Sequence, residues 1–284
     1  MEMVVLNNNF NGGNKGKNYN VVSAAQAHYN AMTAKFNVQT LESLRQTKWL
    51  RSDNLMRVDL PYNLECITIS DMVNATDKIN KGKYTTKIKV VNQTTTEAAM
   101  QAKSKPIVLN FASYKNPGGG FMAGSVAQEE CLCADSNLYN ILEQLQPIYA
   151  MQGMAVQGGV YYTSVFYTPD VVFKSMRKVD VITCAAPNRG VALRSGYADN
   201  YINAAMAERI YSILYMAARY SDCKTLILGA FGCGVFMNMP EVVATIFKDI
   251  INTHFSGVFE TIVFAILERG TGDKVSAFKK VFEV

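Results

Sequence analysis

Two adjacent glutamates are the residues in this chain best suited to acid–base chemistry. The triplet Gln128-Glu129-Glu130 follows three successive glycines, Gly118 to Gly120, after seven intervening residues. Neighbouring side chains on a helix point about 100° apart, so one carboxylate can hold hydroxyl groups while the other faces a bond to be broken. A partly desolvated carboxylic acid with a raised pKa suits protonation of a leaving oxygen. Acidic residues also stabilise the start of any helix, so the catalytic interpretation of the pair depends on the residues around it.

The glycine triplet lies between a predicted buried strand, Ile107 to Phe111, and the helix that the glutamates begin. Glycine reaches positive φ and lets the backbone approach a ligand without a Cβ clash. Consecutive N–H groups can form an anion-binding concavity, and a helix N-terminus favours phosphate. A flexible surface turn is the alternative for such a triplet, but the position between strand and helix favours a binding loop.

A second glycine-rich segment, LGAFGCGVF, follows the predicted strand Thr225 to Leu228. Gly229, Gly232 and Gly234 free its backbone, and Phe236 stands at its far end. An ordinary turn that requires glycine is the alternative interpretation. The presence of two such loops, each directly after an apolar strand, favours a shared binding site.

Strands and helices alternate along the chain from about residue 65. Such alternation implies a mostly parallel or mixed sheet with helices on both sides, which binds ligands in loops beyond the strand C-termini. The loops after Phe111 and Leu228 are of this kind. The predicted strands are Cys66–Ile69, Thr86–Val91, Ile107–Phe111, Val179–Ala185, Thr225–Leu228 and Thr261–Ile266. The predicted helices are Thr94–Lys103, Gln128–Gln144, Asn200–Tyr220, Pro240–Asn252 and Lys274–Phe282.

Three regions are predicted along the chain. Residues 1–20 are rich in Asn, Gly and Lys without periodicity, which is typical of a flexible tail. Residues 21–65 show apolar side chains at helical spacing and are predicted to form a helical accessory region. This region either forms a small lobe or covers one face of the main sheet. Residues 66–284 are predicted to form the main α/β domain.

Composition excludes several classes of site. The six cysteines form no CxxC pair and there are only two histidines, so we expect no zinc site and no Ser-His or Cys-His nucleophile. No apolar run approaches the length of a membrane span and no secretion signal is visible. The net charge of +5 comes without a dense Lys/Arg cluster, so no sequence-specific nucleic acid is expected. We expect a cytoplasmic monomer.

The glycine triplet, the seven-residue spacing and the QEE triplet together resemble the signature of the poly(ADP-ribose) glycohydrolase family. The flanking segments, FASYKNPGGGF and QEECLC, resemble the bacterial-type branch of that family. The resemblance implies a macrodomain-like fold, a three-layer α/β/α sandwich with a mixed sheet. It also implies hydrolysis of the ribose–ribose O-glycosidic bond in poly(ADP-ribose), without a metal or a cofactor.

The resemblance assigns roles to residues of both loops. Glu130 matches the acid that protonates the glycosidic oxygen and then activates water, and Glu129 matches the residue that orients the terminal ribose. Gln128 matches a supporting position in the same loop, and the three glycines would line the ribose and diphosphate. Asn116 is expected to bind substrate, and Ser113 stands where some members have Asn. The second loop would place Gly232, Cys233, Gly234 and Val235 against the diphosphate and Phe236 against the terminal ribose.

Two other functions share this predicted pocket. An ADP-ribose-binding macrodomain reader would keep both glycine loops but has no need of the QEE triplet. A mono-ADP-ribosyl hydrolase would differ in what lies beyond the terminal ribose. The expected ligand is ADP-ribose or its polymer, free or attached to protein.

Overall fold

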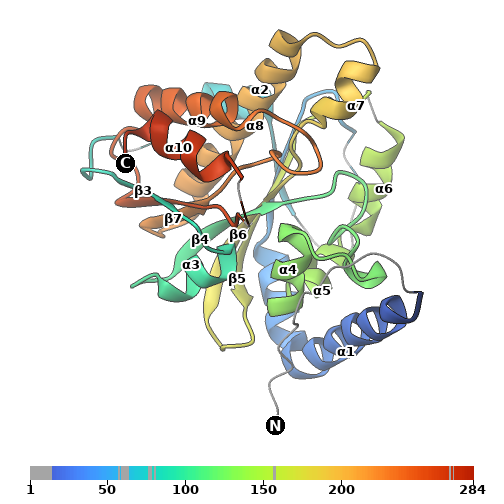
Figure 1. The fold of residues 1–284 in the computed structure, drawn as a ribbon. Coiled ribbons are helices and arrows are strands. Elements are labelled where there is room, and N and C mark those ends of the chain that lie inside the picture. Colours follow the sequence, from blue (N-terminus) through green and yellow to red (C-terminus); the bar gives the residue numbers. More distant parts are fainter. Residues whose placement is uncertain are drawn as a thin grey trace.

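Eight β-strands of the described chain form one sheet, in the order β2-β1-β5-β6-β4-β7-β8-β3 (Figure 1). The computed structural model describes residues 15–284 except 57, 59–63, 76–78, 80, 156–157, 269 and 271. The strands are β1 (Lys48–Arg51), β2 (Glu65–Thr68), β3 (Lys87–Val91), β4 (Pro106–Phe111), β5 (Ser164–Val172), β6 (Lys178–Cys184), β7 (Thr225–Leu228) and β8 (Thr261–Ala265). The sheet is mixed, because β5 runs antiparallel to β1 and β6 while the other neighbouring pairs are parallel.

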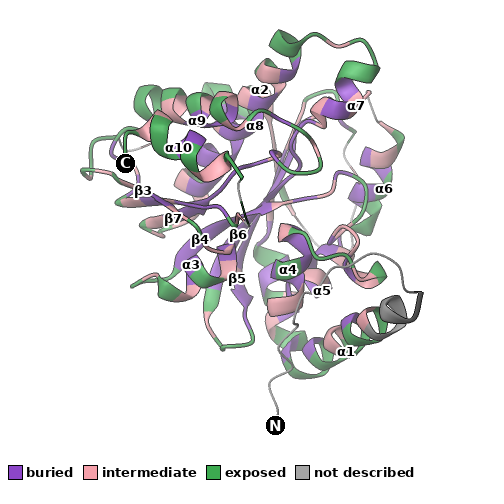
Figure 2. Ribbon diagram, in the orientation of Figure 1, coloured by how far each residue is buried: buried purple, intermediate pink, exposed green. Residues whose placement is uncertain are grey.

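Helices cover both faces of the sheet, so the fold is a three-layer α/β/α sandwich whose buried strands lie in the middle (Figure 2). The first face carries α2 (Ile69–Asn74), α8 (Asp199–Tyr220), α9 (Pro240–His254) and α10 (Lys274–Phe282). The second face carries α1 (Lys15–Gln46), α3 (Thr95–Gln101), α4 (Gln128–Asp135), α5 (Leu138–Glu143) and α6 (Gln146–Met154). The short helix α7 (Arg189–Arg194) packs beside α8.

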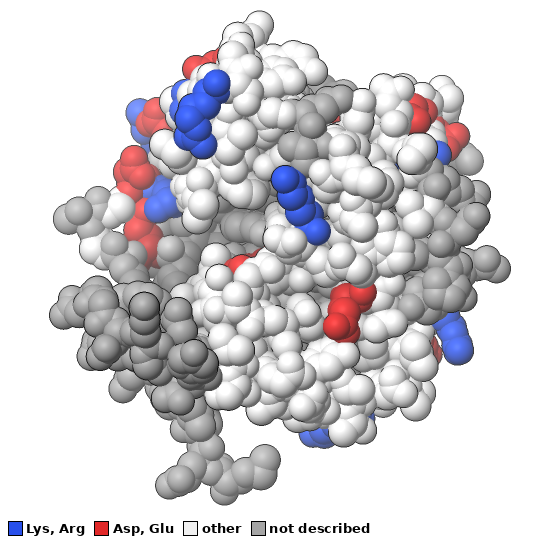
Figure 3. All heavy atoms as spheres, turned by 90° about the vertical axis from the view of Figure 1, so that its right-hand side faces the viewer, with Lys and Arg blue, Asp and Glu red and all other residues white. Residues whose placement is uncertain are grey.

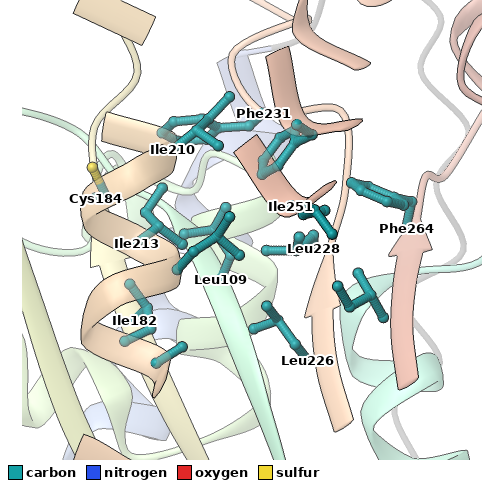
Figure 4. Close-up of a cluster of buried hydrophobic side chains, with 14 of the residues drawn as sticks. Leu109, Ile182, Cys184, Ile210, Ile213, Leu226, Leu228, Phe231, Ile251 and Phe264 are labelled. Atoms are coloured by element: carbon teal, nitrogen blue, oxygen red, sulfur yellow. The ribbon is translucent and has the colours of Figure 1, made fainter. Parts of the chain in front are cut away.

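Alternating strand residues supply the two apolar cores. Leu109 of β4 points into the first core, and its neighbour Val108 points into the second. Figure 4 shows the first core, in which strand side chains such as Leu109 and Leu226 belong to one cluster with Ile213 of α8. Strands buried on both faces in this way account for the nearly continuous apolar runs in the sequence.

The N-terminal region differs from the prediction for residues 1–20. Helix α1 begins at Lys15, inside the predicted tail, while residues 1–14 lie outside the described residues. Residues 15–20 contain no proline and a single glycine, so nothing in them ends the helix. After a kink at Phe36, α1 runs along β5 and leads into β1 of the main sheet. It therefore covers part of one sheet face, while the proposed division at residue 65 stays a prediction.

All six predicted strands are present, but β1 and β5 were missed. The strand β1 has only four residues, with a charged residue at each end. The strand β5 is interrupted by a register shift between Thr168 and Val171, where Pro169 and Asp170 break the apolar pattern. Both strands were hidden because their patterns are short or interrupted.

The predicted helix Gln128–Gln144 is two helices, α4 and α5. Ser136 and Asn137 separate them. The Asn137 side chain forms hydrogen bonds with two other segments of the chain. Its Oδ1 accepts the N–H of Val172 at 2.9 Å, and its Nδ2 donates to Thr40 Oγ1 at 2.9 Å. A buried asparagine that binds two distant segments ends α4 after two turns, which holds the helix start close to the sheet.

Candidate active site

A cavity of about 400 Å³ opens at the carboxyl-terminal ends of the parallel strands. Its walls come from the loops after β4, β6 and β7 and from the first turn of α4. Both glycine-rich loops therefore lie on one cavity. The residues that line it are Phe111, Ala112, Ser113, Asn116, Gly119, Gly120, Ala127, Gln128, Glu129, Glu130, Ala186, Ala230, Phe231, Gly232, Gly234, Val235 and Phe236.

Glu130 lines this cavity from the first turn of α4 and is only 8% exposed. Its Oε1 accepts the backbone N–H of Gly120 at 2.8 Å. Its Oε2 is buried and has no hydrogen-bond partner among the described residues. Because a buried carboxylate oxygen without a partner is costly, Oε2 is the atom of this site most in need of a hydrogen bond from a ligand.

Glu129 is held more firmly than its neighbour. Its Oε2 accepts the backbone N–H of Ser113 at 2.8 Å, and its Oε1 accepts Nδ2 of Asn110 at 3.1 Å. Burial raises the pKa of Glu129 to about 8, although these two hydrogen bonds act in the opposite direction. The charge of Glu130 raises that pKa further. The carboxyl group of Glu129 is therefore mostly protonated at neutral pH.

Gln128 ties the start of α4 to strand β4. Its Oε1 accepts the N–H of Phe111 at 2.8 Å, and its Nε2 donates to the carbonyl oxygen of Leu109 at 2.8 Å. The same Nε2 lies 3.0 Å from Thr95 Oγ1. Because its amide is occupied in this way, Gln128 lines the cavity mainly as a support that fixes where the two glutamates begin.

The glycine loop wraps closely around the two carboxylates. Gly119 has a φ of +62°, and a Cβ there would lie 2.5 Å from Glu130 Oε1 and 2.8 Å from Glu129 Oε2. Only glycine fits this position without displacing both glutamates. Gly118 also has a positive φ, but it packs on the ring of Tyr139 and does not line the cavity.

The second loop supplies the opposite wall. Gly232, Gly234, Val235 and Phe236 line the cavity, and Val235 is 85% exposed at its rim. Cys233 belongs to the same loop but is buried, and it does not line the cavity. The cavity thus gathers all the predicted catalytic and ligand-binding residues except Gly118 and Cys233, which pack behind its walls.

One residue of the site was missed by sequence reasoning. Asn110, which binds Glu129, reads in the sequence as part of an apolar strand; the only available signal was an amide side chain within such a run. A second cavity of about 280 Å³ adjoins the first and shares Phe111, Gln128 and Ala230 with it. Ile266 and Leu267, just beyond β8, form part of its wall.

The raised pKa of Glu129 makes the stability of the fold depend on pH. A group whose pKa is raised by folding contributes full stability below its unfolded pKa, near 4.5, and that contribution is lost as pH rises through about 8. We expect the Glu129→Gln variant to lack this loss, because the amide stays neutral. The difference in free energy of unfolding between the two proteins should therefore shift in favour of the variant, by up to a few kcal/mol, between pH 5 and 8.

Urea unfolding of both proteins at several pH values checks this expectation. The comparison isolates Glu129, because the other titrating groups are common to both proteins. A difference that stays constant from pH 5 to pH 8 would show that Glu129 titrates normally in the folded state.

The sequence matches the family model described as "Microbial-type PARG, catalytic domain" over residues 20–175, where PARG denotes poly(ADP-ribose) glycohydrolase. This match covers more than half of the chain. The chain belongs to the microbial-type PARG family. It is accordingly a hydrolase of the glycosidase class. No curated protein is similar enough in sequence to count as a match.

Solved PARG structures share this fold. The poly(ADP-ribose) glycohydrolase from Thermomonospora curvata superposes with a TM-score of 0.77 at 26% identity, over 93% of this chain and 100% of that chain. Its complex with the inhibitor ADP-HPD gives a TM-score of 0.74, at 26% identity over 92% and 99% of the two chains. The Deinococcus radiodurans enzyme in complex with ADP-ribose gives 0.71, at 31% identity over 86% and 96%.

Within residues 15–284 as described, no group of three or more His, Cys, Asp or Glu side chains is arranged to hold a metal ion. No helix in that part of the chain is long and apolar enough to cross a membrane. Figure 3 shows one side of the molecule, where the charged side chains of the described residues are of both signs and form no continuous basic patch.

Proposed function

We propose that this chain hydrolyses the ribose–ribose O-glycosidic bond of poly(ADP-ribose) and releases ADP-ribose, with Glu130 as the acid–base catalyst. The observation that carries the proposal is the buried, unpartnered Oε2 of Glu130 inside a cavity walled by two glycine-rich loops. A reader of ADP-ribose needs the loops but has no use for such a carboxyl group. The ADP-ribose complex of the Deinococcus radiodurans relative supports this ligand.

In the proposed complex, ADP-ribose occupies the two adjoining cavities. The terminal ribose lies between Glu130 and Phe236, and the diphosphate lies against the backbone N–H groups of Gly232 and Gly234. The adenosine half then extends into the second cavity, towards Ile266. The two cavities together offer about 400 and 280 Å³, which is within the range of sites for ligands of this size.

The first chemical step is departure of the linking oxygen. Glu130 donates its carboxyl proton to that oxygen, and the bond to the anomeric carbon breaks with oxocarbenium character. Glu129, fixed by Ser113 and Asn110, holds the ribose hydroxyls, and the negative charge left on Glu130 stabilises the oxocarbenium centre. Water then attacks the anomeric carbon while Glu130 removes its proton, which restores the starting state.

This mechanism predicts an alkaline limit to activity. Proton donation leaves a negative charge on Glu130, which forms more easily beside a neutral Glu129, and the raised pKa of Glu129, about 8, keeps that carboxyl group protonated at neutral pH. We expect kcat/KM to fall as pH rises through about 8, approaching a tenfold loss for each further pH unit. Initial rates of polymer hydrolysis from pH 6 to pH 10 measure this limb, and a flat profile above pH 8 would contradict the requirement for a protonated Glu129.

The function itself is tested with defined substrates. Purified protein is incubated with poly(ADP-ribose) of known length and, separately, with protein carrying single ADP-ribosyl groups. We expect ADP-ribose to be released from the polymer. Release from the mono-modified protein alone would identify a mono-ADP-ribosyl hydrolase, and tight binding of ADP-ribose without any release would identify a reader.

A further inference from the structure

A small cavity lies behind the strand end that leads into the glycine loop. Its volume is about 10 Å³, and it lies between α6 and the strands β5 and β6. A space of about 10–15 Å³ holds one water molecule when polar groups line it. The lining residues are Ala112, Ser113, Tyr149, Gln152, Ser164, Phe166, Thr183, Cys184 and Ala185.

Tyr149 is a polar group of this lining that has no partner. Its side chain is 1% exposed, and its hydroxyl has no hydrogen-bond partner among the described residues. The ring cannot turn away freely, because it stacks on Phe166 at 6.1 Å, which in turn stacks on Trp49 at 6.1 Å. Burial raises the pKa of Tyr149 well above its ordinary value, so the hydroxyl stays protonated and available as a donor.

Other hydroxyl groups of the lining continue towards the active site. Thr183 Oγ1 lies 3.4 Å from Asn110 Nδ2, and the same Nδ2 donates to Glu129 Oε1 at 3.1 Å. On the other side, Ser164 Oγ accepts Nε1 of Trp49 and Nε2 of Gln152, each at 2.9 Å. Polar side chains thus extend from the buried core under α6 to Glu129, and the small cavity lies among them.

The backbone at the cavity wall also reaches the catalytic pair. Ser113 lines the small cavity, and its N–H donates to Glu129 Oε2 at 2.8 Å. Anything that fixes Ala112 and Ser113 from behind therefore fixes the direction of this N–H. Leaving the Tyr149 hydroxyl without a partner would cost about 1–3 kcal/mol, whereas a water with several polar neighbours satisfies it.

We propose that one internal water molecule occupies this cavity, and that Tyr149, acting through it, is a positioning residue for Ser113 and Glu129. The water accepts the Tyr149 hydroxyl hydrogen and hydrogen-bonds to Thr183 and to the strand end at Ala112 and Ser113. Tyr149 itself does not touch the substrate. The catalytic consequence rests on the proposed function, because it concerns the carboxyl pair of that reaction.

The test compares two buried tyrosines. Tyr149→Phe removes only the hydroxyl that faces the cavity. Tyr167→Phe is the matched control: Tyr167 is also buried, but its hydroxyl donates to Asp180 Oδ2 at 2.9 Å, away from the site. We expect Tyr149→Phe to lower kcat about tenfold with little change in KM, because Glu129 is less well oriented. The alkaline limb should also move to higher pH, by roughly half a unit, because a weaker Ser113 hydrogen bond stabilises the Glu129 carboxylate less.

Two outcomes overturn the proposal. The first is a Tyr149→Phe variant with the kcat and pH profile of the parent, or one that changes no more than Tyr167→Phe. The second is a high-resolution crystal structure of the parent protein with no ordered water within about 3 Å of the Tyr149 hydroxyl oxygen. The crystal structure does not depend on activity, so a protein that fails to cleave polymer would refute the proposed function while the water site is still tested.

Discussion

The Glu130→Gln variant is expected to bind ADP-ribose as the parent does and to lose nearly all turnover. In the parent protein, Glu130 Oε1 accepts the Gly120 N–H at 2.8 Å. The side-chain oxygen of glutamine can accept the same N–H, so the glycine loop keeps this hydrogen bond. It carries no transferable acidic proton, and general acid–base catalysis contributes about 10²–10⁴-fold. We expect kcat on poly(ADP-ribose) to fall by about 10³-fold or more, with the Kd for ADP-ribose within a few-fold of the parent.

The measurement pairs polymer hydrolysis with titration calorimetry of ADP-ribose. Glu260→Gln serves as the control, because Glu260 is exposed at the opposite end of the strands, just before β8. It should behave as the parent in both assays. If Glu130→Gln cleaves polymer at the parental rate, Glu130 is not the acid and the mechanism is wrong.

The second large effect is expected from Gly119→Ala. Its Cβ would lie 2.5 Å from Glu130 Oε1 and 2.8 Å from Glu129 Oε2, so either the loop or both carboxylates must move. Misplacing reacting groups by about 1 Å costs roughly 10²-fold in rate. We expect kcat/KM on the polymer to fall by about that factor or more, although no charged or hydrogen-bonding side chain is removed.

Gly196→Ala separates this contact from backbone strain. Gly196 also has a positive φ, +84°, but a Cβ there would meet nothing within 4 Å. Both variants bear the cost of alanine in the left-handed region, about 1 kcal/mol. Only Gly119→Ala should lose activity. Equal activity losses in the two variants would mean that strain or unfolding, and not the carboxylates, explains the result.

Most of the sheet could be predicted from the sequence, because strands that are buried on both faces consist of nearly continuous apolar residues. The strands around Leu109, Ile182 and Ile227 are examples, since each has neighbours in both cores. The strand β5 is a counter-example, because Pro169 and Asp170 at its register shift interrupt the run. The division of helix 128–144 depends on contacts of Asn137 with Thr40 and Val172, which no local pattern contains.

The candidate site is likewise predicted where its pattern is local in the sequence and missed where it depends on contacts between distant segments. The spacing between the glycine triplet and the glutamates is local, and the structure gathers these residues on one cavity. What the sequence could not show is which groups hold them. Asn110 reaches Glu129 because β4 ends beneath α4, and Tyr149 reaches the same region from α6. Likewise, Cys233 turns inward although its neighbours line the cavity.

In the proposed complex, the Glu130 carboxyl group faces the anomeric carbon of a ribose whose diphosphate lies on the second glycine loop. A crystal structure of the Glu130→Gln variant with ADP-ribose tests it most directly. We predict that the side chain at position 130 lies within about 3.5 Å of the oxygen on the anomeric carbon of the terminal ribose, with phosphate oxygens against the N–H groups of Gly232 and Gly234. A ribose placed away from residue 130, or a diphosphate bound away from the second loop, would contradict it.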